Sequence, residues 1–179
     1  MIDLYCERVG PGMFAEPLNA LTNLFLIMAA AYCGYIAQRA KRQDAMLLAL
    51  LICAIGIGSA VFHTFATIWA QWLDVIPIML FQFTYVWLYL RRILLWNLID
   101  ALRFISLFAA AIYFSTLFPE ILNGSLNYLP TLFVLVLIGL LHYQSKCPDT
   151  SAIFAASIVF LFSLTARTID NILCVHWPI

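Results

Sequence analysis

Residues 44–66 read DAMLLALLICAIGIGSAVFHTFA, an apolar run with one acidic residue at its start and one histidine near its end. An α-helix needs about 20 such residues to cross a hydrocarbon core of roughly 30 Å. The stretch therefore predicts a membrane-spanning helix. Its polar side chains Ser59 and His63 then lie within or beside lipid, where polar groups are costly and each is a candidate for a site.

The segments outside 44–66 have the same character. Of the 179 residues, 65% are hydrophobic and 10% are charged, whereas a soluble domain carries about 25% charged residues. We find no linker long enough to separate domains, so we predict one domain, 1–179, that is an all-α, polytopic transmembrane bundle. A short acidic segment at 1–16 precedes six helices, which we place at about 17–38, 44–66, 72–93, 98–118, 127–143 and 151–173.

The charges exclude one class of partner and indicate an orientation. Lys+Arg and Asp+Glu are equal at 9 each, and no basic run with interleaved aromatics occurs, so we expect no nucleic-acid partner. Basic residues gather in three connections between segments, at 39–42, 91–103 and 146. Because basic loops stay in the cytoplasm, we predict an integral multi-pass membrane protein whose N-terminus is extracytoplasmic.

Two arginines do not fit that charge pattern. Arg8 and Arg167 lie near the opposite ends of the predicted helices, and each has an acidic neighbour, Glu7 and Asp170 respectively. Arg167 and Asp170 are three apart and can pair along a helix. We interpret the second pair as structural, with a role in lining a site as the alternative.

The polar residues of the second and third segments form the sharpest cluster. Ser59 and His63 are four apart and share one helix face, while Asp74 starts the next helix after a very short turn, at about the level of His63. Gly56 and Gly58 let a neighbouring helix approach closely just before that face. Zinc chemistry uses such groups: a histidine as ligand, a carboxylate to take a proton from water, and a hydroxyl to stabilise an oxyanion.

The same residues also have a purely structural interpretation. Ser59 could bond a backbone carbonyl, and His63 and Asp74 could pair where the helices end. The other histidines, His142 and His176, stand alone near the predicted interfaces. We interpret both as interfacial side chains rather than ligands.

A second cluster lies at the N-terminus. Asp3, Tyr5, Glu7 and Glu16 could hold a hard cation such as calcium through oxygen ligands. The alternative is a solvated acidic tail, with Glu16 as the N-cap of the first helix. Asn19 and Asn23 share the face of Glu16, and for both we expect hydrogen bonds to another helix.

These motifs resemble the alkaline ceramidases, part of a wider superfamily of seven-helix membrane hydrolases and receptors. The match extends over most of the chain. Its parts are Asp3-Leu-Tyr-Cys-Glu7, Glu16-Pro-Leu-Asn-Ala-Leu-Thr-Asn23, Gly58-Ser-Ala-Val-Phe-His63 with Asp74, and Arg167-Thr-Ile-Asp170.

The resemblance implies a zinc-dependent amidase that cuts ceramide-like lipids, within the membrane, to a sphingoid base and a fatty acid. It implies His63 as one of three zinc ligands, Asp74 as the general base and Ser59 as the residue that stabilises the oxyanion. It also implies that the N-terminal acids form a calcium site, although Val9 stands where an oxygen ligand is expected.

The other two zinc ligands of the family form a histidine pair four apart in a seventh helix. No His-x-x-x-His occurs here, and the ending His176-Trp-Pro-Ile179 directly after a membrane segment looks interrupted. We therefore expect the seventh helix to lie beyond this chain, with an incomplete zinc site as the alternative.

Two other functions stay open at this point. A receptor-like or lipid-sensing relative would share the fold and use the polar cluster to bind a head group without turnover. A structural membrane protein would use the same residues only to hold helices together.

Overall fold

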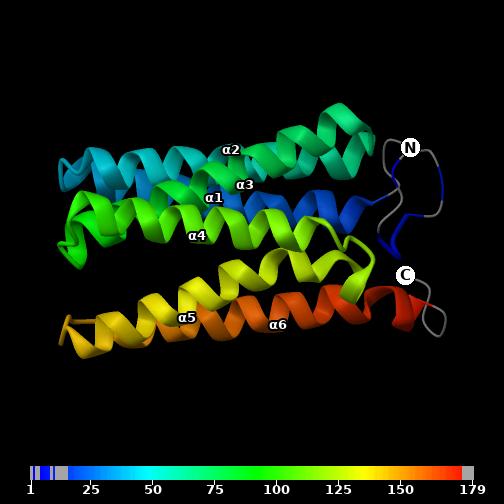
Figure 1. Ribbon diagram of the computed structural model, residues 1–179. Helices are drawn as coiled ribbons and strands as arrows, with labels where there is room; N and C mark the ends of the chain where they lie inside the picture. The colour runs from blue at the N-terminus through cyan, green and yellow to red at the C-terminus, as the bar shows by residue number, and fades with distance from the viewer. Residues whose placement is uncertain (1, 3–4, 9, 11–15, 175–179) are drawn as a thin grey trace. The chain divides into compact units, whose positions relative to one another are not determined.

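The described residues of the computed structural model (2, 5–8, 10 and 16–174) form helices and no strand (Figure 1). A π-helical turn, η1 (Tyr89–Ile93), follows α3, and a 3-10 segment, η2 (Ile121–Tyr128), precedes α5. The six α-helices are α1 (Pro17–Arg39), α2 (Gln43–Phe65), α3 (Ile68–Leu88), α4 (Leu98–Thr116), α5 (Leu129–Gln144) and α6 (Thr150–Cys174).

Each of the six helices is long and apolar enough to cross a membrane, counting η1 with α3 and η2 with α5. Large apolar side chains also point away from the protein. Phe25 is 71% exposed, Phe133 69% and Phe162 76%. Lipid solvates such side chains and water does not. The predicted all-α membrane bundle is confirmed, and the protein is an integral, multi-pass membrane protein.

The largest difference from the predicted boundaries concerns α3. We expected this helix to begin near residue 72, but it begins at Ile68, so that the connection from α2 is only Ala66 and Thr67. Ala66 makes this turn in the left-handed conformation, with φ 46°. Asp74 therefore lies in the second turn of α3 and does not start the helix.

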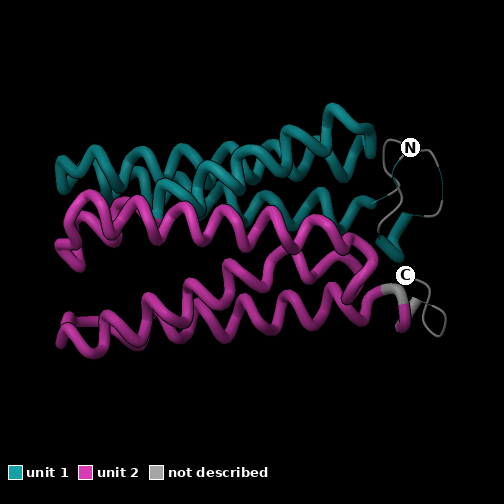
Figure 2. Tube along the Cα trace, in the orientation of Figure 1, with its two compact units in different colours: residues 1–85, 178–179 teal, residues 86–177 magenta. Residues whose placement is uncertain are grey.

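The chain divides into two compact units, and the division falls within α3, after Tyr85 (Figure 2). The first unit holds the N-terminal segment, α1, α2 and most of α3. The second holds the end of α3 and the helices from α4 to α6. Each unit is described by itself below.

Alanine and glycine form most of the seam between α1 and α2 in the first unit. The buried residues of α1 are spaced by seven, and three buried residues of α2 have the same spacing, which keeps each set facing one neighbouring helix. The side chains at the seam let the backbones approach closely, as is typical of helix pairs in membranes. The members are Asn23, Ala30 and Ala37 on α1, and Ala49, Gly56 and His63 on α2.

The two glycines of α2 serve different neighbours. A Cβ at Gly56 would lie 2.9 Å from Cγ1 of Ile27 on α1. A Cβ at Gly58 would lie 2.0 Å from the carbonyl oxygen of Leu73 on α3, and 3.2 Å from the amide nitrogen of Asp74. The predicted close approach is confirmed at both positions, and at Gly58 it is backbone against backbone.

In the second unit, η2 is anchored to α6 by polar contacts. The Asn123 side chain donates a hydrogen bond to the backbone carbonyl of Arg167 (3.0 Å), and Thr168 donates to the Ser125 hydroxyl (2.9 Å). The guanidinium of Arg167 lies 5.4 Å from the centre of the Tyr128 ring. Arg167 thus holds the end of α6 against η2.

The expectation that His142 stands alone is wrong. This residue is 9% exposed, and its Nδ1 bonds the hydroxyl of Tyr89. Its Nε2 lies 2.7 Å from the carbonyl oxygen of Pro148 and is therefore a donor. The buried ring therefore links η1, α5 and the turn before α6.

Two alanine substitutions separate the tight contact from a loose one. Gly58→Ala forces a Cβ into the Leu73 carbonyl, and we expect the free energy of unfolding to fall by about 1–3 kcal/mol. Gly34→Ala places a Cβ at an ordinary 3.8 Å from Ala49 and Met46, so we expect it to be neutral or stabilising by up to about 1 kcal/mol. Unfolding in detergent, followed by circular dichroism, measures both. Equal effects of the two substitutions would contradict the close packing of α2 on α3.

Candidate functional site

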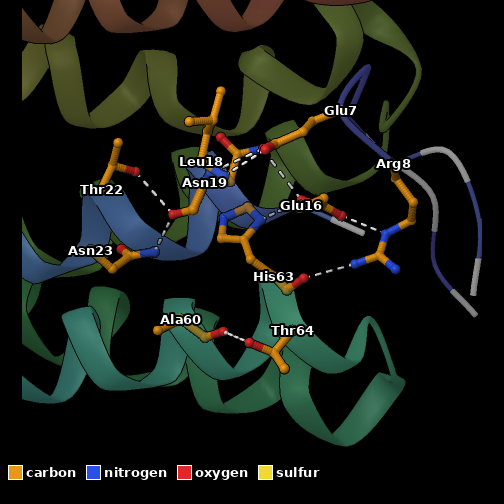
Figure 3. A network of polar contacts seen from close by, with 10 residues as sticks. All are labelled: Glu7, Arg8, Glu16, Leu18, Asn19, Thr22, Asn23, Ala60, His63 and Thr64. Atoms are coloured by element: carbon orange, nitrogen blue, oxygen red, sulfur yellow. Dashed lines mark hydrogen bonds and ion pairs between the residues drawn. The ribbon is translucent and has the colours of Figure 1, made fainter. Parts of the chain in front are cut away.

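The site lies in the first unit, where α1 begins. Pro17 occupies the first position of α1, where its missing N–H is harmless. Glu16 precedes it at the N-cap, but its side chain does not cap the helix. Glu7 does so instead: its carboxylate accepts the amide N–H groups of Leu18 (2.5 Å) and Asn19 (3.0 Å) (Figure 3). The expected N-cap acid is therefore replaced by one nine residues earlier.

The carboxylate of Glu16 is buried and shared by two partners. Its Oε1 lies 2.5 Å from Nε of Arg8, and its Oε2 lies 2.5 Å from Nδ1 of His63 (Figure 3). The side chains of Arg8 and Glu16 are 1% and 2% exposed. Charged groups at this depth must be paired, so the three side chains form one unit, which we call the Glu16 cluster.

Arg8 also reaches the end of α2. Its Nη2 donates a hydrogen bond to the backbone carbonyl of His63 (2.9 Å), in the last turn of that helix. Carbonyls there lack helical partners, and a cation near them is favoured by the helix dipole. Arg8 pairs with Glu16 and not with its sequence neighbour Glu7, because the Glu7 carboxylate already accepts the amide N–H groups at the start of α1.

His63 is held from two sides. Glu16 engages Nδ1, and the Tyr5 ring lies 5.0 Å away, centre to centre. The expected structural pairing of His63 with Asp74 is therefore not what fixes this ring. A histidine whose Nδ1 bonds a carboxylate presents Nε2 to its surroundings, which is the arrangement found behind most metal-ligating histidines.

The two predicted catalytic residues, Ser59 and Asp74, lie on α2 and α3 respectively. Ser59 precedes His63 by four residues, so that both lie on one face of α2. The backbone of Asp74 packs beside Gly58, the neighbour of Ser59. The structure thus brings Ser59 and Asp74 onto facing turns, although Asp74 lies about one turn deeper than the level of His63 that we expected.

The residues predicted for calcium have other partners. Asp3 lies outside the described residues. Tyr5 packs near His63, Glu7 caps α1, and both carboxylate oxygens of Glu16 have nitrogen partners. Calcium takes six to eight oxygens, and the described members of this set do not fit it.

The described residues suit zinc better than calcium, but only in part. His63 offers a nitrogen ligand with a carboxylate behind it. In the described part of the chain, no group of three or more His, Cys, Asp or Glu side chains could hold a metal ion. Of the described residues, His63 is the one whose surroundings suit a zinc ligand.

The asparagines differ from expectation, and the sequence reasoning missed one residue. Asn23 is buried, and its amide donates to the Asn19 carbonyl within α1 (2.9 Å), not to another helix. The Asn19 amide reaches Glu16 at 3.4 Å. The missed residue is Arg8. A signal existed, since a basic residue between acids at the non-basic end of the bundle needs a partner.

Comparisons with known proteins bear on this arrangement. Searches of curated proteins and of solved structures found no match. A protein-family model described as Ceramidase matches residues 5–179. This range contains the Glu16 cluster, Ser59 and Asp74, and the resemblance seen in the motifs is confirmed. The chain belongs to the ceramidase family.

Proposed function

We propose that the protein is a zinc-dependent amidase that hydrolyses the amide of ceramide-like lipids within the membrane. Family membership supports ceramide hydrolysis in general and a hydrolase acting on amides. The observation that carries the finer proposal is the 2.5 Å contact between Glu16 and Nδ1 of His63, buried at the end of a membrane helix. Ionisable groups at such positions are kept mainly for function.

His63 is the metal ligand in this proposal, through Nε2. The carboxylate of Glu16 fixes the tautomer and the orientation of the ring and makes it a better ligand. A bound zinc ion supplies a Lewis acid and a water with a pKa of about 7. Since no group of three or more His, Cys, Asp or Glu side chains that could hold a metal ion occurs among the described residues, the assignment is limited to His63.

Asp74 and Ser59 carry the proton and the oxyanion. The Asp74 carboxylate takes the proton of the attacking water and returns it to the leaving amine, as a general base and then a general acid. The Ser59 hydroxyl donates a hydrogen bond to the oxygen that becomes negative in the tetrahedral intermediate. The packing of α3 against Gly58 supports these roles, since it puts both residues on facing turns.

Zinc content tests the metal ligand. The purified protein in detergent should bind about one zinc per chain. His63→Ala should lose it, because the ligand is gone. Glu16→Gln should weaken binding by about 10–100-fold, because the ring loses its carboxylate partner. His142→Ala is the matched control: it removes another buried histidine and should keep the zinc. Zinc retained in His63→Ala would contradict the assignment.

Turnover tests the general base. Asp74→Asn cannot accept a proton, so we expect ceramide hydrolysis to fall by about 10²–10⁴-fold while the zinc content is unchanged. A fluorescent ceramide in mixed micelles measures the rate. If the wild-type protein bound ceramide and zinc without hydrolysis, a lipid-binding function would replace this proposal.

The proposed orientation places the N-terminus and the Glu16 cluster on the non-cytoplasmic side. The basic loop at 39–42 follows α1 directly, as expected for a cytoplasmic connection. In addition, Cys6 is disulfide-bonded. Disulfides persist in oxidising compartments and are rare in the cytosol. Both observations support an extracytoplasmic N-terminal segment.

Thiol labelling in intact cells tests the orientation. In a Cys147→Ser background, a membrane-impermeant maleimide should label Glu120→Cys, in the connection before α5. Lys41→Cys, in the basic loop, should react only after permeabilisation. Both positions are exposed, so accessibility to the reagent differs by side alone. Labelling of Lys41→Cys in intact cells would reverse the orientation.

A further inference from the structure

The buried negative charge of Glu16 has its counter-charge within the protein. Glu16 is 2% exposed, and a carboxylate at that depth needs a counter-charge. Arg8, at 1% exposed, provides a full positive charge 2.5 Å away. A guanidinium stays charged at every physiological pH and is suited to buried ion pairs. The cluster therefore carries its own cation.

The same guanidinium joins three parts of the first unit. It lies in the N-terminal segment, bonds the residue that precedes α1, and bonds the last turn of α2 through the His63 carbonyl. The segment is further held by the Ile2 amide, which donates to the Ala66 carbonyl in the turn after α2 (2.8 Å). A divalent ion bound by several oxygens could make such a junction, but here an arginine makes it.

A calcium ion at this junction would face poor ligands and a like charge. The two oxygens of Glu7 accept backbone N–H groups, and those of Glu16 accept Nε of Arg8 and Nδ1 of His63. A divalent ion bound to these carboxylates would lie close to the buried guanidinium, and the repulsion between the two is strong where water is absent.

We propose that Arg8 takes the place of a bound calcium ion in this chain: it neutralises Glu16 and so holds the ring of His63, without a metal. Arg8 is thus a positioning residue. The proposal rests on the proposed function only for the role of His63. The stability of the junction and its indifference to calcium are independent of any turnover.

The wild-type protein tests the first half of this proposal. Its midpoint of thermal unfolding in detergent should be the same in EGTA, in 2 mM calcium chloride and in 2 mM magnesium chloride. A midpoint that rises with calcium alone and falls with EGTA would overturn the proposal.

Arg8→Gln tests the second half. The glutamine keeps a polar side chain of moderate length but leaves Glu16 without a full counter-charge. We expect the midpoint to fall by roughly 5–15 °C in EGTA, and calcium, but not magnesium, to restore part of the loss. The matched control is Arg103→Gln, since Arg103 pairs with Asp100 at 3.2 Å with both side chains exposed. That variant should keep the wild-type midpoint and show no response to calcium.

Other outcomes for Arg8→Gln contradict the proposal. A wild-type midpoint would show that the counter-charge is not needed. A lowered midpoint that calcium does not raise would show that Arg8 acts by packing alone.

A charge-conserving variant covers the case in which Arg8→Gln does not fold. Arg8→Lys keeps the charge but cannot bond Glu16 and the His63 carbonyl in the same way. It should melt below the wild type and, because the charge remains, should not respond to calcium. Stabilisation of Arg8→Lys by calcium would count against the proposal. All of these measurements stand even if the protein fails to hydrolyse ceramide, which would refute only the proposed function.

Discussion

A carboxylate withdrawn from water must find positive charge or hydrogen-bond donors, and in this protein that requirement falls on Glu16. Its two oxygens engage Arg8 and His63, which come from the N-terminal segment and from α2. Once these contacts are made, the start of α1, the end of α2 and the preceding segment can no longer move independently. The orientation of the His63 ring is a consequence of neutralising one buried charge.

His63 on α2 can reach Glu16 at the start of α1 because these two helices pack closely. The seam of α1 and α2 has alanine and glycine along most of its length, at intervals of seven, and near its end Asn23 lies beside Gly56, two turns before His63. Van der Waals packing of this kind drives association where lipid is as apolar as the side chains. The polar cluster at the end of the seam adds specificity, because a shift along the seam would separate His63 from Glu16.

Hydropathy was sufficient to predict the six helices, because a membrane imposes a length and an apolar composition that few other structures require. It was insufficient at the start of α3. Gln71 and the tryptophans around it resemble an interfacial turn, yet the helix begins at Ile68 because Ala66 makes the turn with a positive φ.

The candidate site could be predicted in its composition but not in its connections. His63, Ser59 and Asp74 stood out as polar residues in apolar runs, and the spacing placed the first two on one face. The partners did not follow from sequence distance. Arg8 is next to Glu7 in the sequence but bonds Glu16. Glu7 lies nine residues before Glu16, and its carboxylate caps the start of α1. For His142 the partners are 53 and 6 residues away, and only tertiary packing reveals them.

The closed set of contacts in the Glu16 cluster also bears on how the chain enters the bilayer. Arg8 and Glu16 precede α1, and the acceptor carbonyl and the imidazole come with the end of α2. When only α1 has been synthesised, the nascent chain contains Arg8 and Glu16 but not yet His63. Once α2 has followed, both oxygens of Glu16 have their nitrogen partners and Arg8 has its carbonyl acceptor. The hairpin of α1 and α2 is therefore the smallest segment that can move laterally from the insertion machinery into the lipid with the cluster complete.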